Sequence, residues 1–147
     1  MSAFADSSAL VKLYVSERGH DVVRDLPRPL VVATLARVEV PAALWGKVRV
    51  GELAPRDAAI LVSAFEFDYH GDSVGGPAFA AVPVGEELLV SAARLSALHN
   101  LRAYDAVQLA CAKAARSVDE SVHTFAAFDR RLCEAALVEG FTLVGTF

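Results

Sequence analysis

The sequence predicts an α/β protein, a three-layer α/β/α sandwich with a mainly parallel central sheet. Short apolar runs rich in β-branched residues alternate with longer segments of helical periodicity. The apolar runs are continuous rather than alternating, which is typical of parallel strands covered on both faces. Hydrophobic residues make up 54% of the 147 residues, enough for a sizeable core. We see no linker, repeat or low-complexity tract, and therefore expect one domain over residues 1–147.

The expected strands are short apolar runs bounded by turn residues. They cover about 2–5, 30–33, 79–84, 122–128 and 141–144. Pro83 cannot donate a backbone hydrogen bond, so its strand should end there or lie at an edge of the sheet. Successive right-handed crossovers through helices would make the sheet mainly parallel.

The expected helices have apolar residues three or four positions apart. They cover about 7–17, 20–26, 35–50, 55–70, 86–98, 103–115 and 130–139. Gly19, Gly51 and Gly140 each follow a helical pattern, where glycine commonly ends a helix. Pro55 fits the first turn of its helix. The segment 71–77 carries three glycines and a proline and should be a loop.

The helix over 35–50 contains two unusual residues. Thr34 precedes it as a good N-cap, and its apolar side is expected to carry Leu35, Val38, Ala42 and Trp45. Glu39 interrupts this otherwise apolar stretch. Pro41 follows two positions later and should bend the helix beside Glu39.

Composition also limits the compartment and the kind of partner. No apolar run approaches the length of a membrane span, and the start of the chain lacks the features of a signal peptide. Cys111 and Cys133 fall in helical patterns without a CxxC neighbour, so we expect buried thiols in a reducing cytoplasm. The formal charge is −4, so a nucleic-acid partner would have to meet a local basic patch.

Four acidic residues stand in unusual places. Asp6 and Asp129 follow predicted strands, Glu39 lies inside an apolar helix, and Asp105 lies in the first turn of a very apolar helix. Each has an ordinary explanation: Asp6 and Asp129 could cap the next helix, and Asp105 would be favoured by the helix dipole. Glu39 could face solvent or pair with a basic residue, for which Arg37 and Lys47 are the candidates.

The four acids are more informative together. If the first strand is central, Asp6 and Asp129 emerge at the same carboxyl edge of the sheet, where open α/β sheets bind ligands. Glu39 and Asp105 can reach that edge from their helices. Clustered carboxylates stay ionised only if a cation neutralises them, and oxygen ligands suit Mg²⁺ or Mn²⁺. Such a site can activate water against a phosphodiester.

Four segments that contain these acids resemble the motifs of PIN-domain ribonucleases, in the right order and at similar separations. The segments are Phe4–Tyr14, Val38–Trp45, Leu101–Ala110 and Phe128–Leu132. Within that family the sequence is most similar to the VapC-type toxins of toxin–antitoxin pairs. The resemblance covers essentially the whole chain.

The resemblance implies a metal-dependent endoribonuclease that uses Mg²⁺ or Mn²⁺. Asp6, Glu39, Asp105 and Asp129 fall on the family's catalytic and metal-binding positions. Asp6 and Asp105 would bind metal directly, and Glu39 and Asp129 directly or through water. The resemblance also implies a cognate antitoxin and a homodimer. The hydroxyl residue that family members often carry before the last acid is replaced here by Ala127, although serines near Asp6 remain.

Basic residues near the predicted acidic edge are candidates for contact with RNA. They are Lys12, Arg102, Arg130 and Arg131; any one of them taken alone fits a solvated charged surface better. Three other functions stay open as alternatives. One is a PIN-like module that binds RNA or protein without cutting. The others are a phosphatase with Asp6 as nucleophile, although Ser8 stands where that family has its second aspartate, and a relative of flap nucleases.

Overall fold

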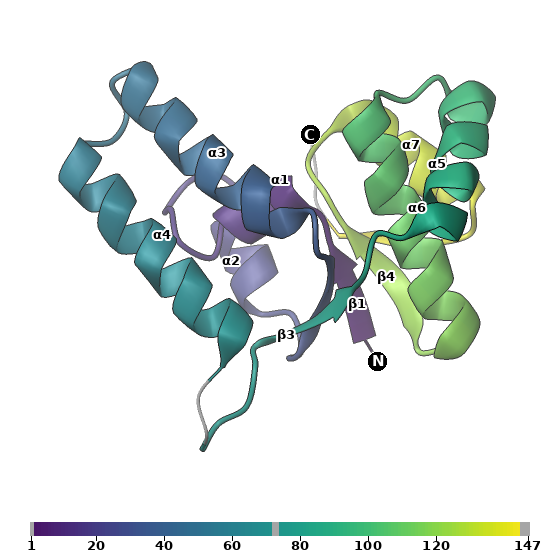
Figure 1. Cartoon of the computed structure of the whole chain (residues 1–147), viewed down its shortest axis with the longest axis horizontal. Helices are drawn as coiled ribbons and strands as arrows, with labels where there is room; N and C mark the ends of the chain where they lie inside the picture. Colours follow the sequence, from purple (N-terminus) through teal and green to yellow (C-terminus); the bar gives the residue numbers. More distant parts are fainter. Residues whose placement is uncertain (1, 72–73, 145–147) are drawn as a thin grey trace.

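The fold is a five-stranded, all-parallel sheet between two layers of helices (Figure 1). A computed structural model describes residues 2–71 and 74–144. The strands stand in the order β3-β2-β1-β4-β5. Their bounds are β1 Ser2–Ala5, β2 Leu30–Ala33, β3 Phe79–Val82, β4 Val122–Ala126 and β5 Thr142–Val144. The predicted α/β/α architecture is therefore confirmed.

The central position of β1 determines what meets at the carboxyl edge of the sheet. β1 pairs with β2 on one side and with β4 on the other, with Ala5 opposite Ala126. The backbone N–H of Asp6 donates to the carbonyl of Ala126 at 3.0 Å, so the two chains leave the sheet side by side. β3 lies at an edge and ends before Pro83, as the sequence predicts.

The helices divide into two layers, one on each face of the sheet (Figure 1). Helices α1 to α4 cover one face, and α5 to α7 cover the other. Their bounds are α1 Ser7–Val11, α2 His20–Arg24, α3 Ala36–Arg49, α4 Pro55–His70, α5 Glu86–His99, α6 Ala103–Val118 and α7 Arg130–Val138. No helix among the described residues is long and apolar enough to cross a membrane.

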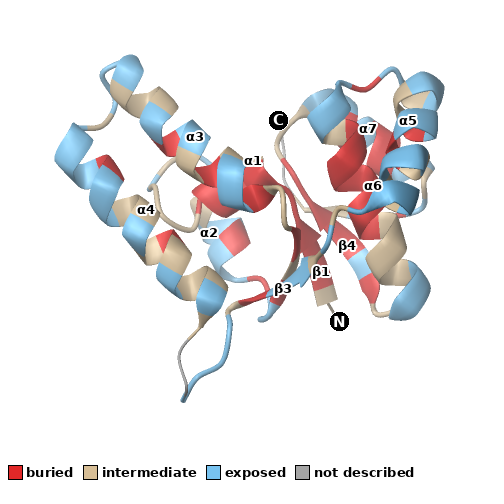
Figure 2. Ribbon diagram, in the orientation of Figure 1, coloured by how far each residue is buried: buried red, intermediate tan, exposed pale blue. Residues whose placement is uncertain are grey.

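Each face of the sheet has its own hydrophobic core, and buried residues lie mainly along the sheet and the inner helix faces (Figure 2). Alternate residues of β1 point to opposite cores: Phe4 packs with α5–α7, whereas Ala3 and Ala5 pack with α1–α4. Phe4 stacks on Phe125 with ring centroids 5.5 Å apart. Cys111 and Cys133 are both buried and form no disulfide, which agrees with the prediction of buried thiols.

The first helix is shorter than the sequence predicts. α1 ends at Val11 instead of continuing to about Glu17. The following backbone N–H groups of Leu13 and Tyr14 bond to carbonyls three residues back, which is the pattern of tight turns. Leu13 and Tyr14 still pack on the core, so the apolar spacing continues without the helix. Gly19, with φ +90°, precedes α2 and does not end α1.

The third helix presents a different face from the predicted one. Its buried residues are Ala36, Val40 and Leu44, whereas Val38 is 69% exposed and Trp45 is 38% exposed. The predicted apolar side is thus wrong for Val38, Ala42 and Trp45, because α3 packs on α1 and α4 through its buried residues instead. Leu35 does pack on the core, as predicted. Pro41 does lie inside α3.

Two further predictions concern ends and loops. Thr34 does not cap α3; its Oγ1 accepts a hydrogen bond from the backbone N–H of Val84 at 3.3 Å instead. Pro55 does stand at the first position of α4. The predicted loop 71–77 follows α4, but Asp72 and Ser73 lie outside the described residues.

Candidate active site

All four predicted acids line one small cavity at the carboxyl edge of the sheet. This acid pocket has a volume of about 240 Å³. It is lined by Asp6, Ser7, Ser8, Glu39, Ala43, Asp105, Gln108 and Asp129. The acids come from four different elements: the ends of β1 and β4 and the first turns of α3 and α6. Segments more than a hundred residues apart in the sequence thus meet in one place.

Asp6 is the most buried of the four acids, with 4% of its surface exposed. Its Oδ1 accepts hydrogen bonds from the Ser8 hydroxyl at 2.7 Å and from the Ala9 backbone N–H at 2.9 Å. The predicted capping role is therefore present. The pKa of Asp6 is raised to about 7, chiefly by burial and also by the nearby Asp105 and Glu39, against the lowering effect of its hydrogen bonds. Near neutral pH this carboxyl group is poised to bind either a proton or a cation.

Ser8 connects Asp6 to the other strand end. Its hydroxyl donates to Asp6 and accepts from the backbone N–H of Phe128 at 3.0 Å. Phe128 immediately precedes Asp129, so this one side chain fixes the separation of the loops that carry two of the acids. Thr124, the hydroxyl residue on β4, is not among the residues that line the pocket.

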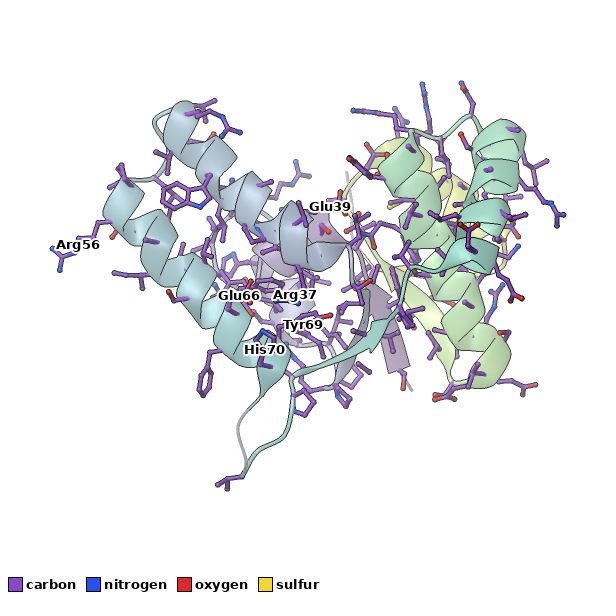
Figure 3. All side chains as sticks on the ribbon, viewed as in Figure 1. Arg37, Glu39, Arg56, Glu66, Tyr69 and His70 are labelled. Atoms are coloured by element: carbon purple, nitrogen blue, oxygen red, sulfur yellow. The ribbon has the colours of Figure 1, made fainter. Side chains whose placement is uncertain are left out.

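Glu39 is held by neutral donors and not by a basic residue. Its Oε1 accepts from the Ser7 hydroxyl at 2.9 Å and from Gln108 Nε2 at 2.7 Å. The two basic candidates are engaged elsewhere: Arg37 lies 3.7 Å from Glu66, and Lys47 lies 2.7 Å from Glu17. Figure 3 shows Glu39 at the end of α3 that faces the sheet, away from the far end of the α3–α4 pair. Glu39 is thus held in the pocket by hydrogen bonds alone, and no described basic residue forms a salt bridge with it.

Gln108 leaves a buried acceptor without a partner. Its Nε2 donates to Ser7 and Glu39, and this orientation is the favourable one because a carboxylate needs a donor beside it. Its Oε1 is then the only buried side-chain N or O atom in the described part of the chain that has no hydrogen-bond partner. Such an atom costs about 1–3 kcal/mol. A cation or its bound water would remove this cost.

Asp105 and Asp129 complete the pocket. Burial raises the pKa of Asp105, and the neighbouring Asp129 and Glu39 raise it further, while Arg102 opposes the shift. Asp129 caps α7, because its Oδ1 accepts from the backbone N–H of Leu132 at 2.9 Å. The capping explanation of the sequence is therefore correct for Asp129 as well as for Asp6, and it is compatible with a place in the pocket.

The donor atoms of the pocket suit a hard divalent cation, but its acids do not form a tight cluster. Carboxylates and a spare amide oxygen are the ligands that Mg²⁺ and Mn²⁺ prefer. Within residues 2–71 and 74–144, however, no three His, Cys, Asp or Glu side chains lie close enough together to hold a metal ion as they stand. The donor set fits the cation, and the side chains would have to move closer to bind it.

The four basic residues predicted near the site differ in availability. Lys12 is only 8% exposed, pairs with Glu17 at 3.0 Å and lies over the Phe128 ring. It is therefore a structural residue and not a free surface cation. Arg102, Arg130 and Arg131 are exposed and line a cavity of about 420 Å³ that also includes Asp105 and Asp129.

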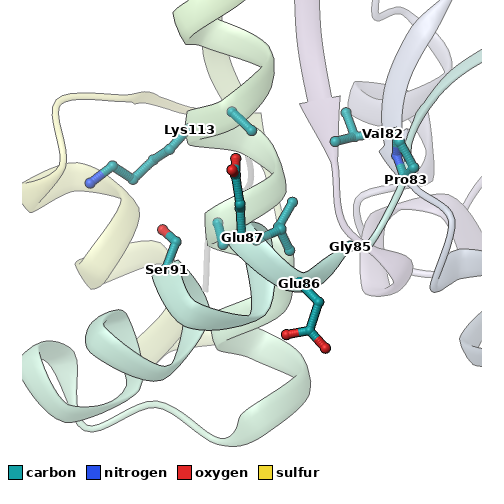
Figure 4. Close-up of a pocket in the computed structure, with 10 residues that line it drawn as sticks. Val82, Pro83, Gly85, Glu86, Glu87, Ser91 and Lys113 are labelled. Carbon is teal, nitrogen blue, oxygen red and sulfur yellow. The ribbon is translucent and has the colours of Figure 1, made fainter.

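A larger cavity lies away from the acids. It has a volume of about 650 Å³, between the segment after β3 and helices α5 and α6 (Figure 4). Its lining is mainly apolar, and its lysine, Lys113, pairs with Glu139 at 2.9 Å. None of the four acids lines it, so size alone does not identify the candidate site in this molecule.

Ser7 and Gln108 were not predicted to position Glu39. A signal for Gln108 was present, because a polar amide stands in a nearly continuous apolar helix three residues after Asp105. That spacing puts both side chains on one face of the helix. No signal connects either residue to Glu39, which lies 32 and 69 positions away.

Comparison with known proteins establishes the fold. The parallel sheet with its strand order and flanking helices is PIN-like. The chain is similar in structure to PAE2754 from Pyrobaculum aerophilum, with a TM-score of 0.58 and 20% sequence identity. The match covers 98% of this chain and 91% of that chain. No protein-family model matches the sequence, and no curated protein matches it.

Proposed function

We propose that this protein is a Mg²⁺- or Mn²⁺-dependent endoribonuclease that hydrolyses RNA phosphodiester bonds in the acid pocket. The observation that carries the proposal is the convergence of Asp6, Glu39, Asp105 and Asp129 on one cavity. The PIN-like fold and the motif resemblance agree with it. All four acids are candidates for metal binding and catalysis, with Asp6 and Asp105 as direct ligands.

Different side chains of the pocket have different roles in the proposed hydrolysis. The four acids would hold a divalent cation, which would supply an activated water and neutralise charge on the phosphodiester. Ser7 and Gln108 fix one oxygen of Glu39. In the described part of the structure its other oxygen, Oε2, makes no hydrogen bond, and so it can accept the proton of the attacking water. Ser8 links Asp6 to the loop that carries Asp129, because its hydroxyl bonds to both Asp6 and the backbone N–H of Phe128.

RNA cleavage by the purified, partner-free protein tests this proposal. Wild type and Asp105→Asn are incubated with a mixture of cellular RNAs in Mg²⁺ or Mn²⁺ and then with a chelator. We expect discrete fragments that require both the metal and Asp105. A fully active Asp105→Asn protein, or cleavage that survives the chelator, would contradict the proposed site.

We further propose that the protein is the toxin of a type II toxin–antitoxin pair in the cytoplasm, with a cognate antitoxin and a homodimeric state. The motif resemblance supports this proposal, and exposed apolar side chains on α3 and α4 agree with a protein partner. They are Val38, Trp45, Ile60 and Phe67. Expression of active protein should arrest growth and Asp105→Asn should not; equal growth would contradict the toxin role.

The second candidate is a PIN-like module that binds RNA or protein without cutting. It is favoured by one observation, namely that no three acids in the described residues are close enough to hold a metal. Calorimetric titration with Mn²⁺ separates the two candidates. A binding-only module predicts RNA affinity with no metal uptake at the acids.

A further inference from the structure

The cavity beside the acid pocket carries three guanidinium groups. This arginine cavity is lined by Arg102, Asp105, Asp129, Arg130, Arg131 and Glu134. Asp105 and Asp129 line both cavities, so the two spaces adjoin at these carboxylates. One extended ligand could therefore occupy the acid pocket and the arginine cavity at the same time.

We propose that the arginine cavity binds a backbone phosphate of single-stranded RNA, next to the phosphodiester that lies at the acids. The inference rests on the proposed function, because it assigns a substrate subsite to the same active site. It specifies which side of the acid pocket holds the strand and which residues do so: Arg102 and Arg131, with Arg130 in support.

Two of the three arginines form no salt bridge with another described residue, although carboxylates line the same cavity and Arg102 attracts Asp105 across it. Neither Arg102 nor Arg131 has a carboxylate within salt-bridge distance in the part of the chain that the structure describes, and Arg131 donates only to the Asn100 carbonyl at 3.4 Å. Arg130 lies 3.5 Å from Glu134, and both side chains are largely exposed. Guanidinium groups bind phosphate oxygens with paired, charge-assisted hydrogen bonds.

The local backbone adds to the attraction. α6 begins directly after Arg102, and no side chain caps its first turn. Its free N–H groups and the positive end of its dipole therefore remain available to an anion. α7, by contrast, is capped by Asp129. The arginines and the α6 terminus thus act on the same space, although the terminus alone would not define a site.

A second cavity next to the acid pocket has only lysines that are already paired, within the described residues. It has a volume of about 350 Å³ and adjoins the pocket through Ser8 and Ala43. Its two lysines, Lys12 and Lys47, both pair with Glu17, and Lys47 also lies 3.2 Å from Glu52. We assign the phosphate to the arginine cavity because Arg102 and Arg131 form no salt bridge among the described residues, whereas both lysines of the second cavity do.

Burial of the acids favours a single strand over a duplex. Asp6 is only 4% exposed, so a phosphate has to enter the pocket to approach it. An unpaired strand can bend its backbone into such a recess, whereas an A-form duplex holds its phosphates on a stiff surface.

Binding of RNA without cleavage tests the inference. A short fluorescein-labelled single-stranded RNA of mixed sequence is titrated with protein in EDTA, and anisotropy reports the affinity. We expect Arg102→Ala/Arg131→Ala to bind roughly tenfold more weakly or worse than wild type, and to lower the salt dependence of binding. The matched control is Arg56→Ala/Arg94→Ala, which removes the same charge from α4 and α5. Arg56 lies at the far end of α4 (Figure 3).

The outcomes separate this inference from the proposed function. A selective loss in the Arg102/Arg131 variant supports the phosphate subsite even if no condition yields cleavage, in which case the nuclease proposal alone fails. Equal affinities of the two double variants would overturn the subsite, even if the protein cuts RNA. No measurable binding by wild type would overturn it as well.

Discussion

Asp6 is under opposing influences that make it the most informative single residue. It caps α1 and accepts two hydrogen bonds, yet burial and two neighbouring acids raise its pKa to about 7. An acid whose pKa is higher in the folded than in the unfolded state destabilises the fold once it ionises. Its contribution to stability is therefore greatest below its ordinary pKa of 3.8 and is lost as the pH rises to about 7.

Replacement of this carboxylate should stabilise the protein. We expect Asp6→Asn to raise the free energy of unfolding at pH 8, because an amide keeps the acceptor for Ser8 and Ala9 without the buried charge. Urea denaturation at several pH values measures this effect. The variant should lose part of the pH dependence between 3.8 and about 7, whereas the exposed control Asp25→Asn should keep it. If Asp6→Asn instead destabilises the protein at pH 8, the negative charge of Asp6 must already be compensated by its surroundings in the wild type.

Gln108 allows a test of positioning without a change of charge. Gln108→Met has similar volume but removes both the donor to Glu39 and the unpaired Oε1, so the melting temperature should change little. Cleavage should fall by roughly tenfold or more because Glu39 loses one of its two donors. Gln108→Glu should instead lower the melting temperature, since it places a second carboxylate beside Glu39. Normal cleavage by Gln108→Met would remove the residue from the mechanism.

At the scale of elements, the approach of α2 to the β4–α7 link depends on one glycine. Gly19 has φ +90°, and a Cβ there would lie 2.5 Å from the Phe128 ring. The ammonium group of Lys12 lies over the ring of Phe128, and Phe128 immediately precedes Asp129. This contact therefore connects the start of α2 to one of the acids.

A pair of alanine substitutions separates backbone strain from steric contact. Gly51 has φ +80° but open space around its Cβ position. We expect Gly51→Ala to cost about 1 kcal/mol from backbone strain alone. Gly19→Ala should cost more, roughly 2–3 kcal/mol, because the Phe128 ring must also move. Chemical denaturation measures both variants, and equal losses would mean that the ring moves away without cost.

The sequence predicted elements well where burial is continuous and poorly where packing partners decide. All five strands were found because buried parallel strands are uninterrupted apolar runs. α1 was expected to be too long because Leu13 and Tyr14 keep a helical spacing while packing in turns. The buried face of α3 was misplaced because Val38 and Trp45 are apolar but exposed. Single-sequence periodicity does not show which apolar side chains stay at the surface.

The candidate site was predictable only in part. The four acids were found because each is a charge in an apolar setting, and the structure places all four in one pocket. The serines beside Asp6 were noted, but the contacts of Ser7 and Gln108 with Glu39 were not predicted, because serine and glutamine are common in any position. Lys12 was expected to be a surface cation but is buried against Phe128 and Glu17. These contacts join residues that the sequence gives no means of pairing.

At the scale of the whole molecule, groups with opposite pKa shifts should give stability a maximum. Hydrogen bonds from Lys47 and Lys12 lower the pKa of Glu17 despite its partial burial, and His99 and Lys113 lower the pKa of Glu139. Their contribution is present above their ordinary pKa of 4.5 and is lost as the pH falls. Asp6 and Asp105, whose pKa values are raised, act in the opposite direction.

We therefore expect the melting temperature to be highest in weakly acidic solution, to fall steeply in stronger acid and to fall gradually toward pH 8. Differential scanning calorimetry across this range, in a chelator, measures the profile. Mn²⁺ should restore stability at pH 8 and have little effect at pH 4, because protonated carboxyls bind metal poorly. A profile that Mn²⁺ raises equally at both pH values would indicate binding outside the acid pocket.

The most direct measurement of the central claim is calorimetric titration of Mn²⁺ into wild type, Asp105→Asn and Glu87→Gln at pH 8. Glu87 lines the larger cavity away from the acids and serves as the matched control. If the acid pocket is a metal site, wild type and Glu87→Gln will bind Mn²⁺ equally, and Asp105→Asn will bind at least tenfold more weakly. Equal binding by all three proteins, or none by wild type, would contradict the assignment of these four carboxylates as a metal-dependent active site.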